Sequence, residues 1–177
     1  MDFRLSYSPQ QEIRAIELPG SKSVTNRALI INALSQRPAR IEGIAHCDDT
    51  IAITDALKQC DCARIDIGAA GTAMRFLTAY FASMPGVSLT LTGTQRMLCR
   101  PIKPLVDSLM QMDADITYLG EDGFPPLSIE GKRLKGGNIS IRGDISSQFI
   151  SALMMIGPTL NGGLNIQLLG EVVSRSY

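Results

Sequence analysis

The chain has 177 residues, of which 45% are hydrophobic, enough for one hydrophobic core or two small ones. Lysine and arginine together number 17, as do aspartate and glutamate, so the basic excess typical of nucleic-acid-binding proteins is missing. The sequence contains neither an apolar run near the length of a membrane span nor a basic and apolar leader, so we expect a cytoplasmic protein that contacts no membrane and no nucleic acid.

The first element predicted in the chain is a helix that begins in a polar, cationic turn, within the stretch LPGSKSVTNRALIINAL. Gly20 allows a ligand to approach the backbone, and Ser21 and Ser23 can cap free N–H groups. The helix dipole adds partial positive charge beside Lys22. Arg27 lies four residues after Ser23, so these two side chains share one side of the helix. The segment therefore predicts an anion-binding site.

Two later segments repeat this order of residues. Gly-Ala-Ala-Gly-Thr at 68–72 precedes a helix predicted from Ala73, and Gly-Asp-Ile-Ser-Ser-Gln at 143–148 precedes one predicted from Phe149. Further helices are predicted near Asp48 and after Pro101, where the apolar residues have helical spacing. The repetition indicates one plan for the whole chain.

Short runs rich in β-forming residues separate the predicted helices. They lie at Ala39–Ile44, Arg64–Ile67, Val87–Thr92, Asp115–Tyr118, Leu127–Glu130, Asn138–Arg142 and Leu164–Leu169, with a further strand-like stretch at Phe3–Ser8. The alternation predicts an α/β repeat protein. The second repeat contains a predicted hairpin over 115–130, which the first repeat lacks.

The cysteines do not form a metal-binding pattern. Cys47, Cys60, Cys62 and Cys99 show no C-x-x-C spacing and are predicted to be free thiols. The run His46-Cys47-Asp48-Asp49 contains metal-ligating residue types, but two aspartates at the start of a helix already have an electrostatic role there. We therefore expect no metal site.

Five motifs, in this order, resemble those of the 5-enolpyruvylshikimate 3-phosphate synthase family. They read LPGSKSVTNR at 18–27, AGTAMR at 70–75, RMLCRPI at 96–102, SSQF at 146–149 and VSRSY at 173–177. The resemblance implies transfer of the enolpyruvyl group of phosphoenolpyruvate to the 5-hydroxyl of shikimate 3-phosphate, with release of phosphate and without a metal or organic cofactor. It also implies an α/β fold of pseudo-threefold repeats, with buried parallel helices and short mixed β-sheets.

The resemblance implies roles for individual residues as well. Lys22 would be catalytic and would contact both substrates. Shikimate 3-phosphate would be bound by Lys22, Ser23, Arg27, Ser146, Ser147, Gln148, Ser174 and Tyr177. Phosphoenolpyruvate would be bound by Lys22, Gly71, Arg96 and Gln148, with Arg75 and Arg100 as further candidates. Many family members have asparagine where this chain has Ala69, so no ligand contact is expected there.

The length of the chain departs from the family, whose members are more than twice as long. In the family, residues 1–17 would belong with the other domain, and residues 18–177 would form the shikimate 3-phosphate-binding domain, truncated in its third repeat. The second domain, which carries the proton-transferring Asp and Glu, is absent. We therefore expect this chain to bind substrate without turnover.

Two other functions stay open at this point. The related enolpyruvyl transferase that acts on UDP-N-acetylglucosamine would have Lys-Asn in place of Lys22-Ser23. The second open function is that of a non-catalytic anion-binding or nucleotide-binding module. The Gly20–Ser23 run, however, lacks the glycines that a P-loop needs. The arginines could instead be solvated or ion-paired on the surface, and Ser146, Ser147 and Thr72 could be plain N-caps.

Overall fold

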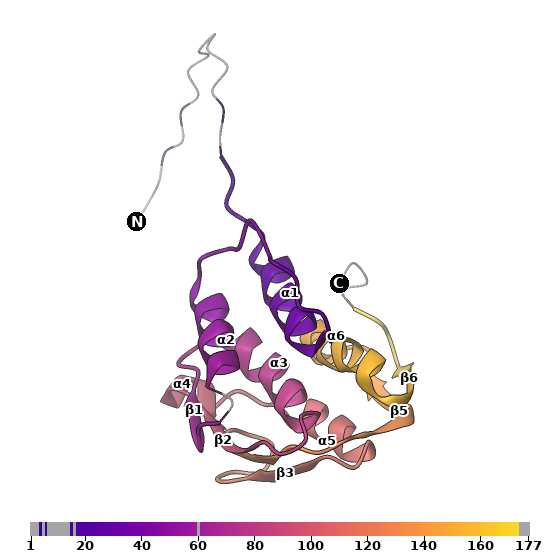
Figure 1. Ribbon diagram of the computed structural model, residues 1–177. Coiled ribbons are helices and arrows are strands. Elements are labelled where there is room, and N and C mark those ends of the chain that lie inside the picture. Colours follow the sequence, from indigo (N-terminus) through magenta and orange to yellow (C-terminus); the bar gives the residue numbers. More distant parts are fainter. Residues whose placement is uncertain (1–3, 5, 7–14, 16, 60, 174–177) are drawn as a thin grey trace.

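The computed structural model describes residues 4, 6, 15, 17–59 and 61–173, in which helices alternate with short strands (Figure 1). The helices are α1 (Lys22–Leu34), α2 (Asp48–Lys58), α3 (Gly71–Ala82), α4 (Gln95–Leu98), α5 (Lys103–Gln111) and α6 (Ser147–Ile156), followed by a 3-10 turn, η1 (Gly157–Thr159). The strands are β1 (Arg64–Asp66), β2 (Ser88–Thr92), β3 (Asp115–Tyr118), β4 (Leu127–Glu130), β5 (Lys135–Arg142) and β6 (Asn161–Leu169). No helix among the described residues has the length and apolar character needed to cross a membrane.

Two short sheets flank the helices. The first has the strand order β1-β2-β4-β3, in which β1 and β2 are parallel and the other neighbours antiparallel. The second is the parallel pair β5 and β6. The antiparallel β3–β4 pair, with Asp115 opposite Glu130, confirms the hairpin predicted over 115–130. Both sheets are short and the first is mixed, as the family resemblance implied.

The strand predicted at Ala39–Ile44 is wrong. These residues form an irregular loop that is mostly exposed and pairs with no described strand. The β-propensity of a segment is realised only when a neighbouring strand satisfies its backbone groups. The short helix α4 was not predicted, and most of the predicted Phe3–Ser8 strand lies outside the described residues.

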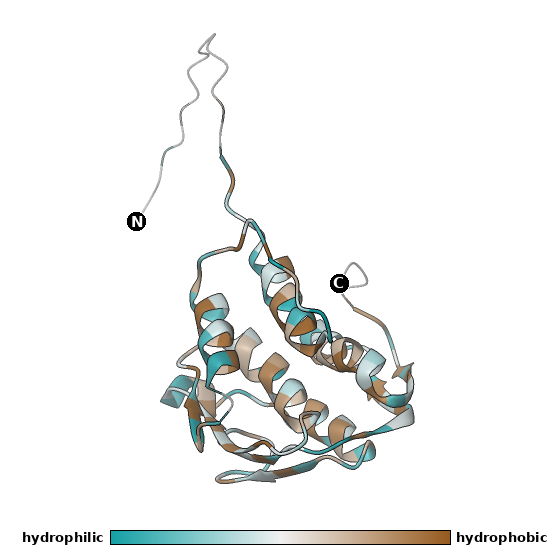
Figure 2. Cartoon of the chain, in the orientation of Figure 1, coloured by the Kyte–Doolittle hydropathy of each residue, from teal (hydrophilic) through white to brown (hydrophobic). Residues whose placement is uncertain are grey.

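The core is built on three helices, α1, α3 and α6, each of which contacts the other two. Every residue of α3 except Arg75 is buried, and Figure 2 shows apolar residues along this and the neighbouring helices. The second helix of each repeat lies on a seam between two central helices: α2 contacts α1 and α3, and α5 contacts α3 and α6. This arrangement confirms the predicted α/β repeats with buried central helices.

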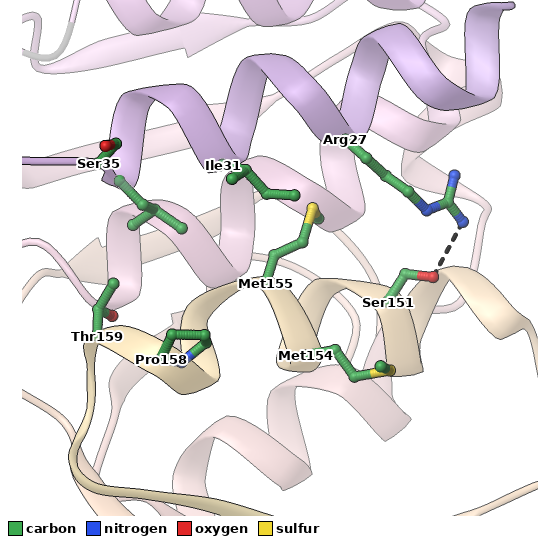
Figure 3. A pocket seen from close by; sticks show the side chains of 9 residues that line it. Arg27, Ile31, Ser35, Ser151, Met154, Met155, Pro158 and Thr159 are labelled. Carbon is green, nitrogen blue, oxygen red and sulfur yellow. Dashed lines mark hydrogen bonds between the residues drawn. The ribbon is translucent and has the colours of Figure 1, made fainter. Parts of the chain in front are cut away.

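The third seam, between α6 and α1, is covered by no helix among the described residues. A groove of about 510 Å³ runs along it, and Figure 3 shows Ile31 of α1 and Met155 of α6 on its two walls. Its lining is mostly apolar. The side chains of Ile31 and Met154 are 54% and 60% exposed. We refer to this surface as the α1–α6 groove.

Candidate anion-binding site at three helix starts

The first turns of α1, α3 and α6 lie at the same end of the core. Ser21 is the N-cap of α1 and accepts a hydrogen bond from Val24 N, and Ser146 is the N-cap of α6 and accepts one from Gln148 N. Thr72 is not an N-cap, because α3 begins one residue before it, at Gly71. In the first turn of α3, the backbone N–H of Thr72 donates instead to a side chain from another helix.

That acceptor is Asp49, in the first turn of α2. Its Oδ1 accepts a hydrogen bond from Thr72 N at 2.8 Å, and its Oδ2 lies 2.6 Å from Lys22 Nζ. Asp49 lies at a helix start, as predicted, but the prediction gave it a role only toward the dipole of its own helix. The sequence offered one signal for the contact. A lysine stands at the start of the first helix of the repeat, and an aspartate stands at the start of the second.

The ion pair shifts the titration of both partners. The pKa of Lys22 is raised, chiefly by its hydrogen bond to Asp49. Burial raises the pKa of Asp49, but hydrogen bonds from Lys22 and Thr72 outweigh burial, so the net shift is downward. The pair stabilises the fold between these pKa values; the contribution is lost in acid as Asp49 is protonated and in strong alkali as Lys22 loses its proton.

Arg27 links the three central helices. Its Nη1 donates to Ser23 Oγ at 2.7 Å and to Ser23 O at 3.0 Å, which confirms that the two residues share one side of α1. Its Nη2 donates to Ser151 Oγ of α6 at 2.9 Å (Figure 3), and its guanidinium carbon lies 5.4 Å from the ring centre of Phe76 on α3. Ser151 was not predicted as part of the site.

Arg75 on α3 makes the same two kinds of contact as Arg27 on α1: a hydrogen bond to a carbonyl four residues earlier, and a contact with a phenylalanine ring of another helix. Its Nη1 donates to the carbonyl of Gly71, four residues earlier, at 2.8 Å, and its guanidinium lies 5.2 Å from the ring centre of Phe149 on α6. Burial, with the nearby charge of Arg100, lowers the pKa of Arg75. Its buried Nε has no hydrogen-bond partner among the described residues. Arg75 is therefore a cation held at a helix start with bonding capacity unused.

Because Gly71 has no side chain, a second arginine, Arg100, also reaches the start of α3. A Cβ atom at Gly71 would overlap Nη1 of Arg100 and lie 3.1 Å from Nη1 of Arg75. Neither arginine forms an ion pair with a described carboxylate. Arg96, on α4, and Arg100 are both exposed, and Arg96 forms no hydrogen bond or ion pair with the described part of the chain. The structure thus brings Arg100, and not Arg96, to the start of α3.

The start of α6 contributes the polar groups predicted from the SSQF motif. Ser146 is exposed, Ser147 and Gln148 are half-buried, and the buried Oε1 of Gln148 has no hydrogen-bond partner among the described residues. Ser174 and Tyr177, which the resemblance also implied, lie outside the described residues.

The cysteines Cys47, Cys62 and Cys99 are free thiols, as predicted, and Cys60 lies outside the described residues. The side chains described above combine four cations (Lys22, Arg27, Arg75 and Arg100) with one carboxylate, that of Asp49. Backbone N–H groups of three helix starts add further donors. Such a group is suited to a ligand with more than one anionic group.

The chain matches a protein-family model and individual known proteins. A family model described as EPSP synthase (3-phosphoshikimate 1-carboxyvinyltransferase) matches residues 9–64 and 59–177, which together span most of the chain. A 3-phosphoshikimate 1-carboxyvinyltransferase of Bacteroides fragilis is 52% identical over all 177 residues, which span 42% of that relative. The 3-phosphoshikimate 1-carboxyvinyltransferase of Shewanella oneidensis is 40% identical, over 98% of this chain and 47% of the relative's length.

Among solved structures, an EPSP synthase from Acinetobacter baumannii matches with a TM-score of 0.78 at 22% sequence identity. The match covers 89% of this chain and 41% of that one, and at this identity it shows the shared fold. The chain therefore spans less than half the length of the curated relatives and of the solved structure that it matches.

Proposed function

Because the chain belongs to the EPSP synthase (3-phosphoshikimate 1-carboxyvinyltransferase) family, we propose that it is the part of such an enzyme that binds shikimate 3-phosphate and one side of phosphoenolpyruvate. The observation that carries the proposal is the convergence of Lys22, Arg27, Arg75 and Arg100 on three helix starts. Both proposed ligands are anionic, and the site offers fixed positive charge and N–H donors in a partly buried setting.

Shikimate 3-phosphate would be bound between α1 and α6. Its phosphate would accept hydrogen bonds from serine hydroxyls and helix N–H groups, and Arg27 would take its carboxylate. The residues proposed for this ligand are Lys22, Ser23, Arg27, Ser146, Ser147 and Gln148, together with Ser174 and Tyr177 outside the described residues. The site's Arg27–Ser23 and Arg27–Ser151 hydrogen bonds support the proposal, because they hold the guanidinium before any ligand arrives.

Phosphoenolpyruvate would be bound beside the start of α3, by Lys22, Gly71 and Gln148. We propose Arg100 as its arginine in place of Arg96, because Arg100 lies against Gly71. In the reaction, the 5-hydroxyl oxygen bonds to the central carbon of the enolpyruvyl group, and the bond from that carbon to the phosphate oxygen breaks. Lys22 would balance negative charge as this happens. Proton transfer would require groups from the part of the relatives that this chain does not cover.

The two arginines of the RMLCRPI motif give a matched test. Arg100→Ala is expected to weaken phosphoenolpyruvate binding by roughly tenfold or more, the loss typical of one charge-assisted hydrogen bond. Arg96→Ala is expected to leave it within about twofold, because Arg100, and not Arg96, is the arginine that lies against Gly71. Binding is measured by calorimetric titration in the presence of saturating shikimate 3-phosphate. A larger loss with Arg96→Ala than with Arg100→Ala would contradict the assignment.

The main experiment is a calorimetric titration of this chain with shikimate 3-phosphate. Inorganic phosphate tests for general anion binding, and UDP-N-acetylglucosamine tests the other enolpyruvyl transfer. Saturable binding of shikimate 3-phosphate well above both is the expected result. Binding should be weaker than in a whole enzyme, because part of the site is missing. Preferential binding of the UDP-sugar would favour the alternative function.

We also propose that residues 18–177 are two repeats and the start of a third, and that residues 1–17 belong with a second domain. The packing of α2 and α5 on two of the three central seams supports this, since the α1–α6 groove is the third such seam. In longer family members a third outer helix would lie in this groove, and the second domain would face the helix starts.

The exposed methionines test the groove assignment. Joining this chain to the part of the Bacteroides fragilis relative that it does not cover is expected to slow peroxide oxidation of Met154 severalfold. Met110, on the outer side of α5 and 47% exposed, is the matched control and should react equally fast in both forms. The rates are read by mass spectrometry of peptides. Equal rates at Met154 before and after joining would show that the groove stays open.

A further inference from the structure

We propose that Asp49 is a positioning residue of the site, which holds the Lys22 ammonium over the start of α3 so that an anionic ligand meets a cation already in place. The inference deepens the proposed function and rests on it for the identity of the ligand. Its basis is the carboxylate of Asp49, which contacts both Lys22 and the first turn of α3. Asp49 was not predicted as a site residue.

The contacts of Asp49 divide between its two oxygens. Oδ1 accepts from Thr72 N of α3 at 2.8 Å, and Oδ2 pairs with Lys22 Nζ of α1 at 2.6 Å. The Asp49 side chain is 10% exposed, whereas that of Lys22 is 54% exposed. An ammonium group has three N–H donors. One is used by Asp49, and the exposure of Lys22 leaves room for others to reach a ligand.

The position of Asp49 is itself fixed by the next residue. Thr50 Oγ1 donates to Asn26 Oδ1 at 2.9 Å, and Asn26 is fully buried on α1, one turn after Lys22. The start of α2 is thereby tied to α1 and, through Asp49, to α3. The carboxylate is the rigid partner, and the long lysine side chain is the part that it orders.

Ordering matters because a lysine side chain is flexible. A free ammonium would lose rotamer freedom when it bound a ligand, and a contact that orders it beforehand removes that loss from binding. Asp48 and Cys47 also lie near enough to raise the pKa of Lys22, but less than Asp49 does, and Asp49 also acts to raise the pKa of Arg75 on α3. Among these groups, only Asp49 forms an ion pair with Lys22 within the described part of the chain.

The first test needs no substrate. In the 177-residue chain with isotope-labelled lysines, the pKa of Lys22 is measured by NMR titration of its side-chain signals. Asp49→Asn is expected to lower it, because the paired charge is gone while the amide oxygen still accepts from Thr72 N. Asp48→Asn, on the same helix turn but exposed, is the matched control and should change it much less. An equal pKa in the parent chain and the Asp49→Asn variant would overturn the proposal.

The second test is a double-mutant cycle on binding of shikimate 3-phosphate. Lys22→Gln is expected to weaken binding roughly tenfold in the parent chain, and less than about threefold when Asp49 is asparagine. Asp49→Glu should restore part of the difference, because it keeps the charge. Thermal unfolding verifies that each variant is folded. Equal effects of Lys22→Gln in both backgrounds would overturn the positioning role.

The two proposals fail separately. If the parent chain does not bind shikimate 3-phosphate, the proposed function fails for this chain, and the same cycle is run with inorganic phosphate. A loss of the Lys22 effect in the Asp49→Asn background would then still support the positioning of Lys22 by Asp49, and additivity would overturn it.

Discussion

Replacing Arg27 with alanine is expected to weaken shikimate 3-phosphate binding by roughly a hundredfold, since a partly buried, pre-ordered charged group is lost. Arg27 is held by Ser23 and Ser151 and lies over the ring of Phe76, so its guanidinium is in place before the ligand binds. A planar guanidinium can also make two parallel hydrogen bonds to a carboxylate. The loss is measured by calorimetric titration of the variant and the parent.

Two further variants make this result specific. Arg37→Ala removes an exposed arginine beyond the end of α1 and should leave binding unchanged, which controls for net charge. Lys22→Ala should weaken binding less than Arg27→Ala, because Lys22 is more exposed and would be shared between two substrates. The reverse order of the two losses would contradict the proposed division of roles between Arg27 and Lys22.

Replacing Phe81 with alanine is expected to lower the free energy of unfolding by about 3–5 kcal/mol, the usual loss for a fully buried phenylalanine. Phe81 is 0% exposed on α3, the helix that contacts both α1 and α6, and it packs edge to face with Tyr80 at 5.3 Å between ring centres. A loss of this size is a large part of the stability of an ordinary domain. Urea unfolding, followed by circular dichroism, measures it.

The control for Phe81 is another apolar side chain outside the core. Leu119→Ala removes a side chain that is 54% exposed, and it should change the free energy of unfolding by less than about 0.5 kcal/mol. Comparable losses for the two variants would mean that α3 is not the centre of the core.

The separation of these two effects follows from the construction of α3. Its first turn carries Gly71 and Arg75, which face the site, and its remaining turns carry Phe76, Leu77 and Phe81, which are fully buried. One helix thus provides both the central packing and a third of the site. Substitution of Arg75 should therefore chiefly change binding, and substitution of Phe76, Leu77 or Phe81 should chiefly change stability.

Much of the local structure was predicted from the sequence, because it depends on neighbouring residues. The helix starts after Gly20, Gly68 and Gly143 were predicted to within a few residues, and so were all six β-strands of the described residues. Periodicity, capping residues and turn residues act over a few positions, and a sequence displays them directly. The five motifs also predicted the family, which the comparisons confirm.

The tertiary structure decided which side chains from distant segments lie close together. Arg96 and Arg100 are four positions apart in one motif, yet it is Arg100 that lies against Gly71, whereas Arg96 is an exposed residue of α4. Asp49 pairs with Lys22 and with Thr72 across two helix boundaries, which no local rule predicts. The stretch Ala39–Ile44 has strand-forming residues but no strand beside it. The sequence by itself thus determined the elements and the family, whereas packing between distant segments decided which polar groups share the site.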